Sequence, residues 1–392
     1  MEAKDSNVIQ TYEVDPYKHL DHLGHGAYGY VDKVCARPDP DPPTPEVYAR
    51  KVIRISPGWS RQNQLRSARK EFQILRRLKH NHIVSVVDIY QFRSRLSIIM
   101  QEVADCDLAE YLQSTDDLED NDPRKFDRRI PMYSWTGCLI QALDYLHEMK
   151  VKHKDIKPGN ILIMDGKVLL ADFGISKDLI DVDTTASLTA NGDIGTRMYC
   201  APEILSGNQR RGRAADVFSL GCVFLEISTV ILQPKGDLGE LSASRELSGS
   251  RLYSNCGSEI LKWINHLRWS DLSLLGLKLE SVAWGFHQCR YSYGFASAEL
   301  AFLMLDPDPK TRITVRQLVA MLQVDKNGYN TNVKMMSCPS CREFPAAPNP
   351  NLPLHSVFKK KEELSLNELL EDQAYLTWDQ AKESWLESHM WR

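Results

Sequence analysis

The sequence of 392 residues has little net charge, no long hydrophobic run and no internal repeat. Its 48 Lys and Arg nearly balance 52 Asp and Glu, so the net charge of -4 indicates no general surface for nucleic acid. No stretch of about 18 consecutive apolar residues occurs. Residues 1–15 also lack the basic-then-apolar order of a secretory signal. We therefore expect neither a membrane span nor translocation.

The cysteines form no pattern that is typical of a disulfide framework. The chain has 9 of them, scattered and mostly among apolar neighbours, which favours reduced thiols in a cytosolic or nuclear protein. Cys338 and Cys341 have the spacing of half a zinc site, but no second such pair follows, and His355 is the only nearby histidine. Because a structural zinc requires four ligands, we expect a loop with two free cysteines here.

The pattern of hydrophobic and turn-forming residues changes near residue 101. Short β-branched runs punctuated by Gly, Pro and Asp precede this point, interrupted by an amphipathic helical pattern at 62–78. Long helical segments follow it. We expect an N-terminal tail over 1–16, a small β-rich part with one helix over 17–101, a mainly helical part over 102–323, and a linker with an acidic tail over 324–392. The length allows either two domains or one two-lobed domain.

The first chemical motif is a glycine-rich segment at 24–31. Glycines at 24, 26 and 29 let a backbone approach phosphates and direct N–H groups at them. A dinucleotide-binding fold would need a helix to open at the third glycine, whereas this sequence continues as a strand.

A lysine on a predicted strand is the second motif. Strand alternation places Ala49 and Lys51 on one face. A lysine on the buried side of a strand needs an anion, and Glu71 on the predicted helix and a nucleotide phosphate are the candidates.

The third motif brings acidic, basic and amide side chains together in one short segment. HKDIKPGN at 153–160 contains Asp155, Lys157 and Asn160, and it is followed by two strand-like runs and by Asp172-Phe173-Gly174. Phosphoryl transfer from a nucleotide needs metal ions, oxygen ligands for them, and a carboxylate that accepts or orients a hydroxyl proton. This motif supplies the required side chains.

With GTRMYCAPE at 195–203 as the fourth motif, the chain resembles the eukaryotic-type protein kinase family, over roughly residues 17–322. The resemblance implies an α+β, bilobal protein-kinase fold with a small antiparallel N-lobe sheet plus one helix and a larger, mainly helical C-lobe. It is closest to the serine/threonine branch, because Lys157 to Asn160 read KPGN and Thr196 precedes the APE segment.

The resemblance also implies the cofactors ATP and Mg²⁺ and a role for each matching residue. Asp155 would accept or orient the substrate hydroxyl, and Lys157 would neutralise the transferring phosphoryl group. Lys51 would bind the α- and β-phosphates and pair with Glu71. The Mg²⁺ ligands would be Asn160 and Asp172. The ATP-binding residues would be Gly24, Gly26, Gly29, Val31, Ala49, Lys51, Met100, Gln101, Val103, Asp107 and Leu162.

Outside the nucleotide site, Glu203 and Arg312 would form a buried structural ion pair, and Asp216 matches another structural position of the family. Thr185 and Thr189 are candidate phosphorylation sites, and Thr196 would face the substrate. Lys154 replaces the family's usual arginine and loses bidentate recognition of a phosphate, so we expect activity that is partly independent of phosphorylation.

These features predict an active kinase whose partners are protein substrates with Ser or Thr hydroxyls. The alternative is a pseudokinase, a scaffold or binding module on the same fold, and a small-molecule kinase is a further alternative. Such scaffolds lack the strand lysine or one of the two aspartates, whereas Lys51, Asp155 and Asp172 are all present. The tryptophan-containing acidic tail is expected to dock on the helical lobe, to bind a partner, or to lie as a surface helix.

Overall fold

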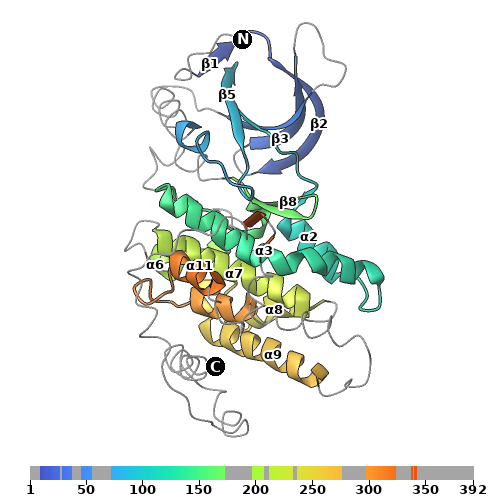
Figure 1. Cartoon of the computed structure of the whole chain (residues 1–392), viewed down its shortest axis with the longest axis vertical. Coiled ribbons are helices and arrows are strands. Elements are labelled where there is room, and N and C mark those ends of the chain that lie inside the picture. Colours follow the sequence, from blue (N-terminus) through green and yellow to red (C-terminus); the bar gives the residue numbers. More distant parts are fainter. Residues whose placement is uncertain are drawn as a thin grey trace. The chain divides into compact units, whose positions relative to one another are not determined.

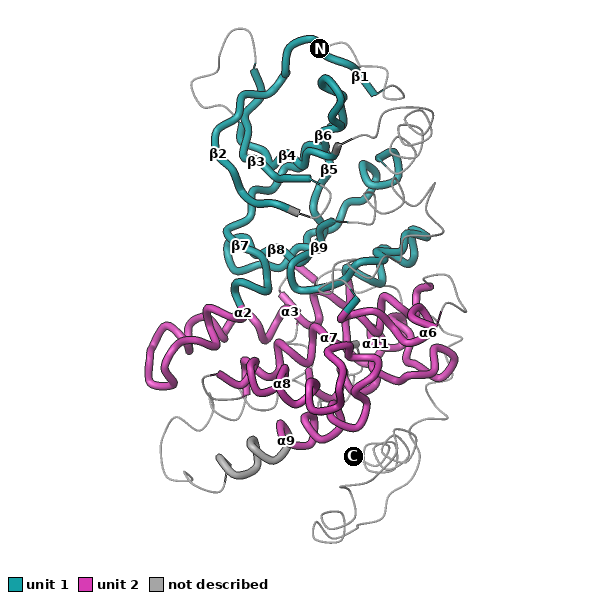
Figure 2. Tube along the Cα trace, turned by 180° about the vertical axis from the view of Figure 1, so that it is seen from behind, with its two compact units in different colours: residues 1–111, 142–197 teal, residues 112–141, 198–392 magenta. Residues whose placement is uncertain are grey.

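A computed structural model describes residues 9–26, 29–37, 46–54, 72–172, 197–206, 212–232, 236–275, 297–323, 337–338 and 340–341 (Figure 1). They fall into two compact units (Figure 2). The first comprises residues 1–111 and 142–197, and the second comprises residues 112–141 and 198–392. The expected α+β class is confirmed, with a β-sheet in the N-terminal region and helices in the C-terminal region. The domain boundaries drawn from the sequence stay predictions.

A six-stranded sheet in the order β1-β5-β6-β4-β3-β2 lies in the first unit. Neighbouring strands are antiparallel, except that β1 and β5 are parallel. Val34, Tyr90 and Ile99 form a fully buried cluster on this sheet. The strands are β1 (Gln10–Tyr12), β2 (Tyr17–Gly26), β3 (Gly29–Ala36), β4 (Val47–Arg54), β5 (Val86–Phe92) and β6 (Arg95–Met100).

Strand β1 and Asp15 belong to the segment that we expected to be a tail. The ring of Tyr12 packs edge-on against that of Tyr90, with 5.7 Å between the centroids. Asp15 Oδ1 accepts a hydrogen bond of 2.8 Å from the Tyr90 hydroxyl. Strand β1 therefore extends the sheet, and Asp15 contacts it.

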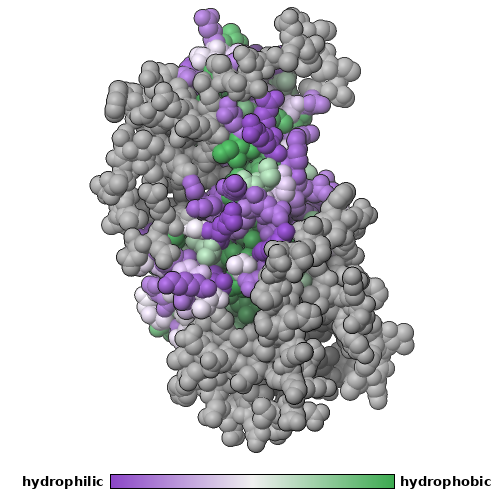
Figure 3. Space-filling model, turned by 60° about the vertical axis from the view of Figure 1, so that its left-hand side comes forward, coloured by the Kyte–Doolittle hydropathy of each residue, from purple (hydrophilic) through white to green (hydrophobic). Residues whose placement is uncertain are grey.

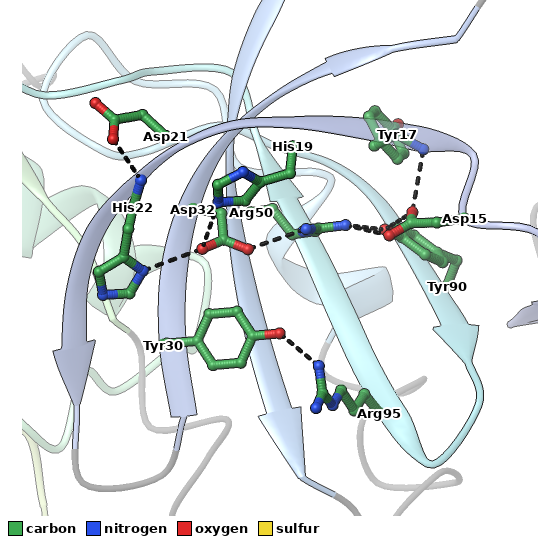
Figure 4. A network of polar contacts seen from close by, with 10 residues as sticks. All are labelled: Asp15, Tyr17, His19, Asp21, His22, Tyr30, Asp32, Arg50, Tyr90 and Arg95. Atoms are coloured by element: carbon green, nitrogen blue, oxygen red, sulfur yellow. Dashed lines mark hydrogen bonds and ion pairs between the residues drawn. The ribbon is translucent and has the colours of Figure 1, made fainter.

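A buried polar network centred on Arg50 crosses this sheet (Figure 4). The Arg50 guanidinium lies 2.9 Å from Asp32 Oδ2, 2.5 Å from Asp15 Oδ2 and 3.2 Å from the Tyr90 hydroxyl. His22 Nδ1 lies 3.2 Å from Asp32 Oδ1. Because side chains alternate along a strand, Arg50 occupies the face of β4 opposite to Ala49 and Lys51.

A second, three-stranded sheet has the order β7-β8-β9, with β7 (Cys106–Asp107), β8 (Ile161–Met164) and β9 (Lys167–Leu170). The turn between β8 and β9 is Asp165-Gly166, with φ angles of 49° and 72°. Positive φ at both turn residues is the geometry that an Asp-Gly pair favours, and it produces a tight hairpin. The short 3-10 helix η1 (Pro158–Asn160) precedes β8 directly, so this hairpin holds the segment at 153–160.

The second unit is helical in its described part. Its central helix α7 is apolar along most of its length, and 89% of its most hydrophobic 18-residue window is buried, as in a core helix. It is the one described helix that is long and apolar enough to cross a membrane. A Cβ on Gly221 of α7 would lie 2.7 Å from Met304 Cβ, so glycine allows close helix packing here. Helix α2 (Leu108–Asp116) begins in the first unit, and helix α3 (Pro123–Glu148) ends there. The other helices of the second unit are α6 (Pro202–Leu205), α7 (Arg213–Leu232), α8 (Asp237–Glu246), η2 (Tyr253–Asn255), α9 (Gly257–Leu275) and α11 (Val315–Gln323).

The described surface visible in Figure 3 is mostly hydrophilic, with small hydrophobic areas between the polar residues. The apolar residues of both units are instead concentrated inside, in keeping with the burial of hydrophobic side chains that stabilises each unit.

Candidate active site

The segment at 153–160 is held in shape by its own amide side chain. Asn160 Nδ2 donates one hydrogen bond to the Asp155 carbonyl at 2.7 Å and a second to Asp155 Oδ2 at 3.0 Å. The Asp155 N–H donates to His153 Nδ1 at 3.4 Å, and His153 is fully buried. Lys154 has a φ of 68°, a conformation that non-glycine residues adopt only where surrounding contacts fix it. The carboxylate of Asp155 is therefore oriented before any ligand binds.

Lys157 stands beside this carboxylate. Its Nζ lies 3.9 Å from Asp155 Oδ2, and the two side chains are 21% and 15% exposed. The contact is long for an ion pair, so the ammonium group can turn toward a bound anion without losing a tight hydrogen bond. A carboxylate that accepts a proton and a cation that balances negative charge are thus adjacent.

The strand lysine has an anionic partner. Lys51 Nζ lies 2.8 Å from Asp172 Oδ1, and the two side chains are 16% and 37% exposed. Asp172 has a φ of 56°, and the Ala171 N–H before it donates to the Asn160 carbonyl at 3.0 Å. This bond joins the end of β9 to η1 and so fixes Asn160 and Asp172 in one frame. Glu71, the other predicted partner of Lys51, lies outside the described residues.

Asn160 and Asp172 have the chemistry of Mg²⁺ ligands. Both hydrogens of the Asn160 amide nitrogen are directed at Asp155, so the ligand atom that this side chain offers is its oxygen. Asp172 offers a carboxylate. Hard divalent cations prefer such oxygen ligands, and Mg²⁺ is typically held by one or two protein oxygens together with substrate phosphates. The donor set therefore fits the ion.

The predicted nucleotide-binding residues of the sheet are placed by strand register. Val31 on β3 pairs with Lys51 on β4, while Ala49 pairs with Met100 on β6. Ala49 and Met100 are 5% and 7% exposed. Ala49, Lys51 and their cross-strand partners consequently share one face of the sheet.

The glycine-rich segment is the turn region between β2 and β3. Gly24 pairs with Val31, and Gly26 pairs with Gly29, whereas residues 27–28 lie outside the described residues. A Cβ on Gly29 would lie 1.8 Å from the Val52 carbonyl oxygen. Only glycine can occupy this position without moving β4, which is a packing reason for this glycine beside its predicted contact with phosphate.

Two hydrogen bonds join the segment that follows β6 to the backbone of Ser85. The Gln101 N–H donates to the Ser85 carbonyl at 3.0 Å, and the Ser85 N–H donates to Glu102 Oε2 at 2.8 Å. Val103 follows, half-buried. Sequence reasoning missed the role of Glu102, because its partner Ser85 lies on a separate strand connection that no local motif marks.

Asp107 begins helix α2 as well as ending strand β7. Its Oδ1 accepts a hydrogen bond of 2.9 Å from the Glu110 N–H, as an N-cap side chain does, and its strand partner on β8 is Leu162. The predicted ribose-binding residue therefore has a structural role that the sequence analysis did not include. The sequence signal for this N-cap was an aspartate at the start of a helical pattern, three positions before Glu110.

The protein kinase domain model matches residues 17–322, which is most of the chain. The chain belongs to the protein kinase family. Cyclin-dependent kinase D-1 of Oryza sativa subsp. japonica is 26% identical over 314 residues, which cover 77% of this chain and 65% of that protein. Cyclin-dependent kinase D-1 of Arabidopsis thaliana is 30% identical over 231 residues, 58% of this chain and 53% of the relative. Serine/threonine-protein kinase crk1 of Schizosaccharomyces pombe is 31% identical over 257 residues, 64% and 69% of the two chains. The chain thus spans less than two thirds of the rice and Arabidopsis relatives.

The remaining predicted residues of this kinase divide into two groups. In the second unit, Arg312 donates to both carboxylate oxygens of Glu203 on α6, at 2.8 and 3.0 Å, and Asp216 is buried in the first turn of α7. The second group lies outside the described residues, so its predicted roles, including the control of activity by phosphorylation, stay predictions. It comprises Thr185, Thr189 and Thr196.

Proposed function

We propose that this kinase transfers the γ-phosphoryl group of ATP to Ser and Thr hydroxyls of protein substrates, by direct in-line transfer. The observation that carries the proposal is the fixed carboxylate of Asp155, held by both hydrogens of Asn160 with Lys157 beside it. An oriented carboxylate next to a cation is what transfer to a hydroxyl requires. The serine/threonine-protein kinase among the relatives supports the choice of acceptor.

In this reaction the substrate hydroxyl gives its proton to the Asp155 carboxylate as its oxygen attacks the γ-phosphorus. The bond between that phosphorus and the β,γ-bridging oxygen breaks, and ADP leaves with the bond electrons. Lys157 balances the negative charge on the phosphoryl oxygens during transfer, and Lys51 positions the α- and β-phosphates. Asn160 and Asp172 would hold Mg²⁺, which when bound neutralises phosphate charge. Because Lys51 lies 2.8 Å from Asp172, its ammonium also orients this ligand.

The test is phosphoryl transfer from labelled Mg²⁺–ATP to a degenerate peptide array by the full chain, compared with its Asp155→Asn variant. Turnover should fall by about 10²- to 10⁴-fold, the usual contribution of a positioned general base. Nucleotide affinity, measured with a fluorescent ATP analogue, should change little, because Asp155 acts on the hydroxyl and not on the nucleotide. Label should appear on Ser and Thr, and not on Tyr.

Two further variants sharpen this experiment. Asp165→Asn is the matched control, because the same change falls in the β8–β9 turn, where φ is 49° and asparagine is tolerated. It should retain wild-type turnover. Lys51→Met should lower both turnover and productive nucleotide binding. Wild-type turnover in Asp155→Asn would refute the assignment, and a wild-type chain that binds nucleotide without any transfer would indicate the scaffold alternative.

A further inference from the structure

A cluster of three cysteines lies in the second unit, and none of the three is among the residues assigned to phosphoryl transfer. Cys138 belongs to helix α3, whereas Cys338 and Cys341 belong to a short segment beyond the region that matches the kinase family. Their sulfur atoms all lie within 4.8 Å of one another. Cys138 and Cys341 are 1% and 6% exposed, and Cys338 is half-buried. Cys338 and Cys341 are free thiols, as expected, and the sequence analysis did not include the third sulfur, that of Cys138.

The segment is held on α3 by bonds that point at a metal site. The Cys341 N–H donates to the Cys338 carbonyl at 3.1 Å, which closes the turn between the two thiols. The Cys338 N–H donates to Cys138 Sγ at 3.3 Å. Backbone N–H groups directed at sulfur favour its thiolate form, which is the form that binds metals. Gln141 lies one turn along α3 from Cys138 and donates to Ser337 Oγ at 2.9 Å.

Three mutually close sulfurs suit a metal better than they suit the alternatives. A disulfide would use two of them and leave the third thiol buried beside it. A tetrahedral zinc with Zn–S bonds of about 2.3 Å places its sulfurs about 3.8 Å apart, so a small contraction would close the site.

Zinc is the ion that this donor set favours. Soft thiolate ligands select Zn²⁺ in a reducing compartment, and structural sites with three cysteines and one histidine are common. With three sulfur ligands from the second unit, the fourth position of a tetrahedral zinc remains for one more donor.

We propose that Cys138, Cys338 and Cys341 bind a structural Zn²⁺ ion, and that the ion fastens the segment of Cys338 and Cys341 onto α3. Binding replaces the three thiol protons by one Zn²⁺ and involves no oxidation. The site would connect the chain that follows the kinase domain to a helix of the domain.

The test begins with metal analysis of the full chain, purified in reducing buffer without chelator. About one zinc ion per chain is expected. After replacement by Co²⁺, the absorption should show sulfur-to-cobalt charge transfer and the visible bands of tetrahedral cobalt. Cys338→Ser removes the most exposed of the three thiols. Its zinc affinity, measured by competition with a chelator, should fall by more than the roughly 10–100-fold that is typical when a residue supporting a metal ligand is lost. Circular dichroism would establish that this variant is folded.

Two matched variants make the result decisive. Cys106→Ser removes a half-buried thiol outside the cluster and should keep the zinc content and the cobalt spectrum unchanged. Cys341→Ser should release zinc faster than the wild type and shift the cobalt bands. The same spectrum and affinity in Cys341→Ser would overturn the site. A reduced wild-type chain that binds neither zinc nor Co²⁺, or one that contains a disulfide within the cluster, would overturn the site. Metal content is measured without ATP, so failure here is distinguishable from failure of the proposed transfer.

Discussion

Breaking the ion pair between Glu203 and Arg312 should destabilise the protein by several kcal/mol. The two side chains are 8% and 0% exposed. Two parallel N–H···O bonds of 2.8 and 3.0 Å join them. The same guanidinium donates to the carbonyls of Asp306 at 2.7 Å and Ala214 at 2.9 Å, and it lies 5.0 Å from the centre of the Phe218 ring. Arg312 is thus the shared partner of several buried acceptors.

The magnitude follows from what each substitution leaves behind. Arg312→Met leaves a nearly buried carboxylate and the carbonyls of Asp306, Ala214 and Pro307 without this donor. Removal of one partner of a buried pair costs about 3–5 kcal/mol. Glu203→Gln keeps the shape and one acceptor oxygen, so the loss should be smaller, about 2–3 kcal/mol. The double variant Glu203→Met/Arg312→Met removes both charges, and its loss should be well below the sum of the two single methionine variants.

The assay is urea denaturation of the full chain, followed by tryptophan fluorescence. With a slope of about 3 kcal/mol per molar, Arg312→Met should lower the midpoint by about 1–1.7 M. Lys310→Met is the control, because this exposed lysine lies two positions away, and its effect should stay within about 0.5 kcal/mol. A loss below about 1 kcal/mol for Arg312→Met, or simple additivity in the double variant, would refute the reasoning.

The Arg50 network yields two further predictions. Arg50→Met should lower the free energy of unfolding by about 3–5 kcal/mol, because it leaves Asp15 and Asp32 without their shared cation. The measurement is the melting temperature, which should fall. An unchanged melting temperature would argue against the network. Burial, together with the hydrogen bond to Asp15 and opposed by Arg50, raises the pKa of Tyr90 to about 12. Because the unfolded chain releases this proton near pH 10, the stabilisation is complete below pH 10 and is lost between about pH 10 and 12. Tyr90→Phe should remove this part of the alkaline loss, as measured by denaturation at several pH values.

Residues that act together within one short segment could be predicted from the sequence. Asp155, Lys157 and Asn160 are contiguous with the hairpin that holds them, so their spacing already constrains their geometry. The Asp165-Gly166 turn is likewise a local signal. Strand alternation correctly placed Ala49 and Lys51 on one face of β4. Each of these inferences needs only the backbone period or the conformational preference of a turn.

Other parts depend on partners that are far apart along the chain. A three-residue strand such as β1 is too short to show a period of two. The contact between Asp15 and Arg50 joins residues that are far apart in sequence, and it goes with the pairing of β1 and β5. Asp107 could be matched to a nucleotide-binding role by motif, while its capping bond depends on where α2 begins. Helix boundaries are among the least predictable features of a sequence.

The cysteine cluster shows why an incomplete motif is weak grounds for excluding a site. Cys338 and Cys341 supply only half of a zinc pattern, and no second cysteine pair follows in the sequence. The third sulfur lies 200 positions earlier, on the face of α3 that also carries Gln141. Cys138 among apolar neighbours looks the same in sequence whether it fills a core or binds an ion, since burial is common to both. Only the close approach of a second segment separates the two cases, so a half-motif that follows a folded domain should be compared with the buried cysteines of that domain.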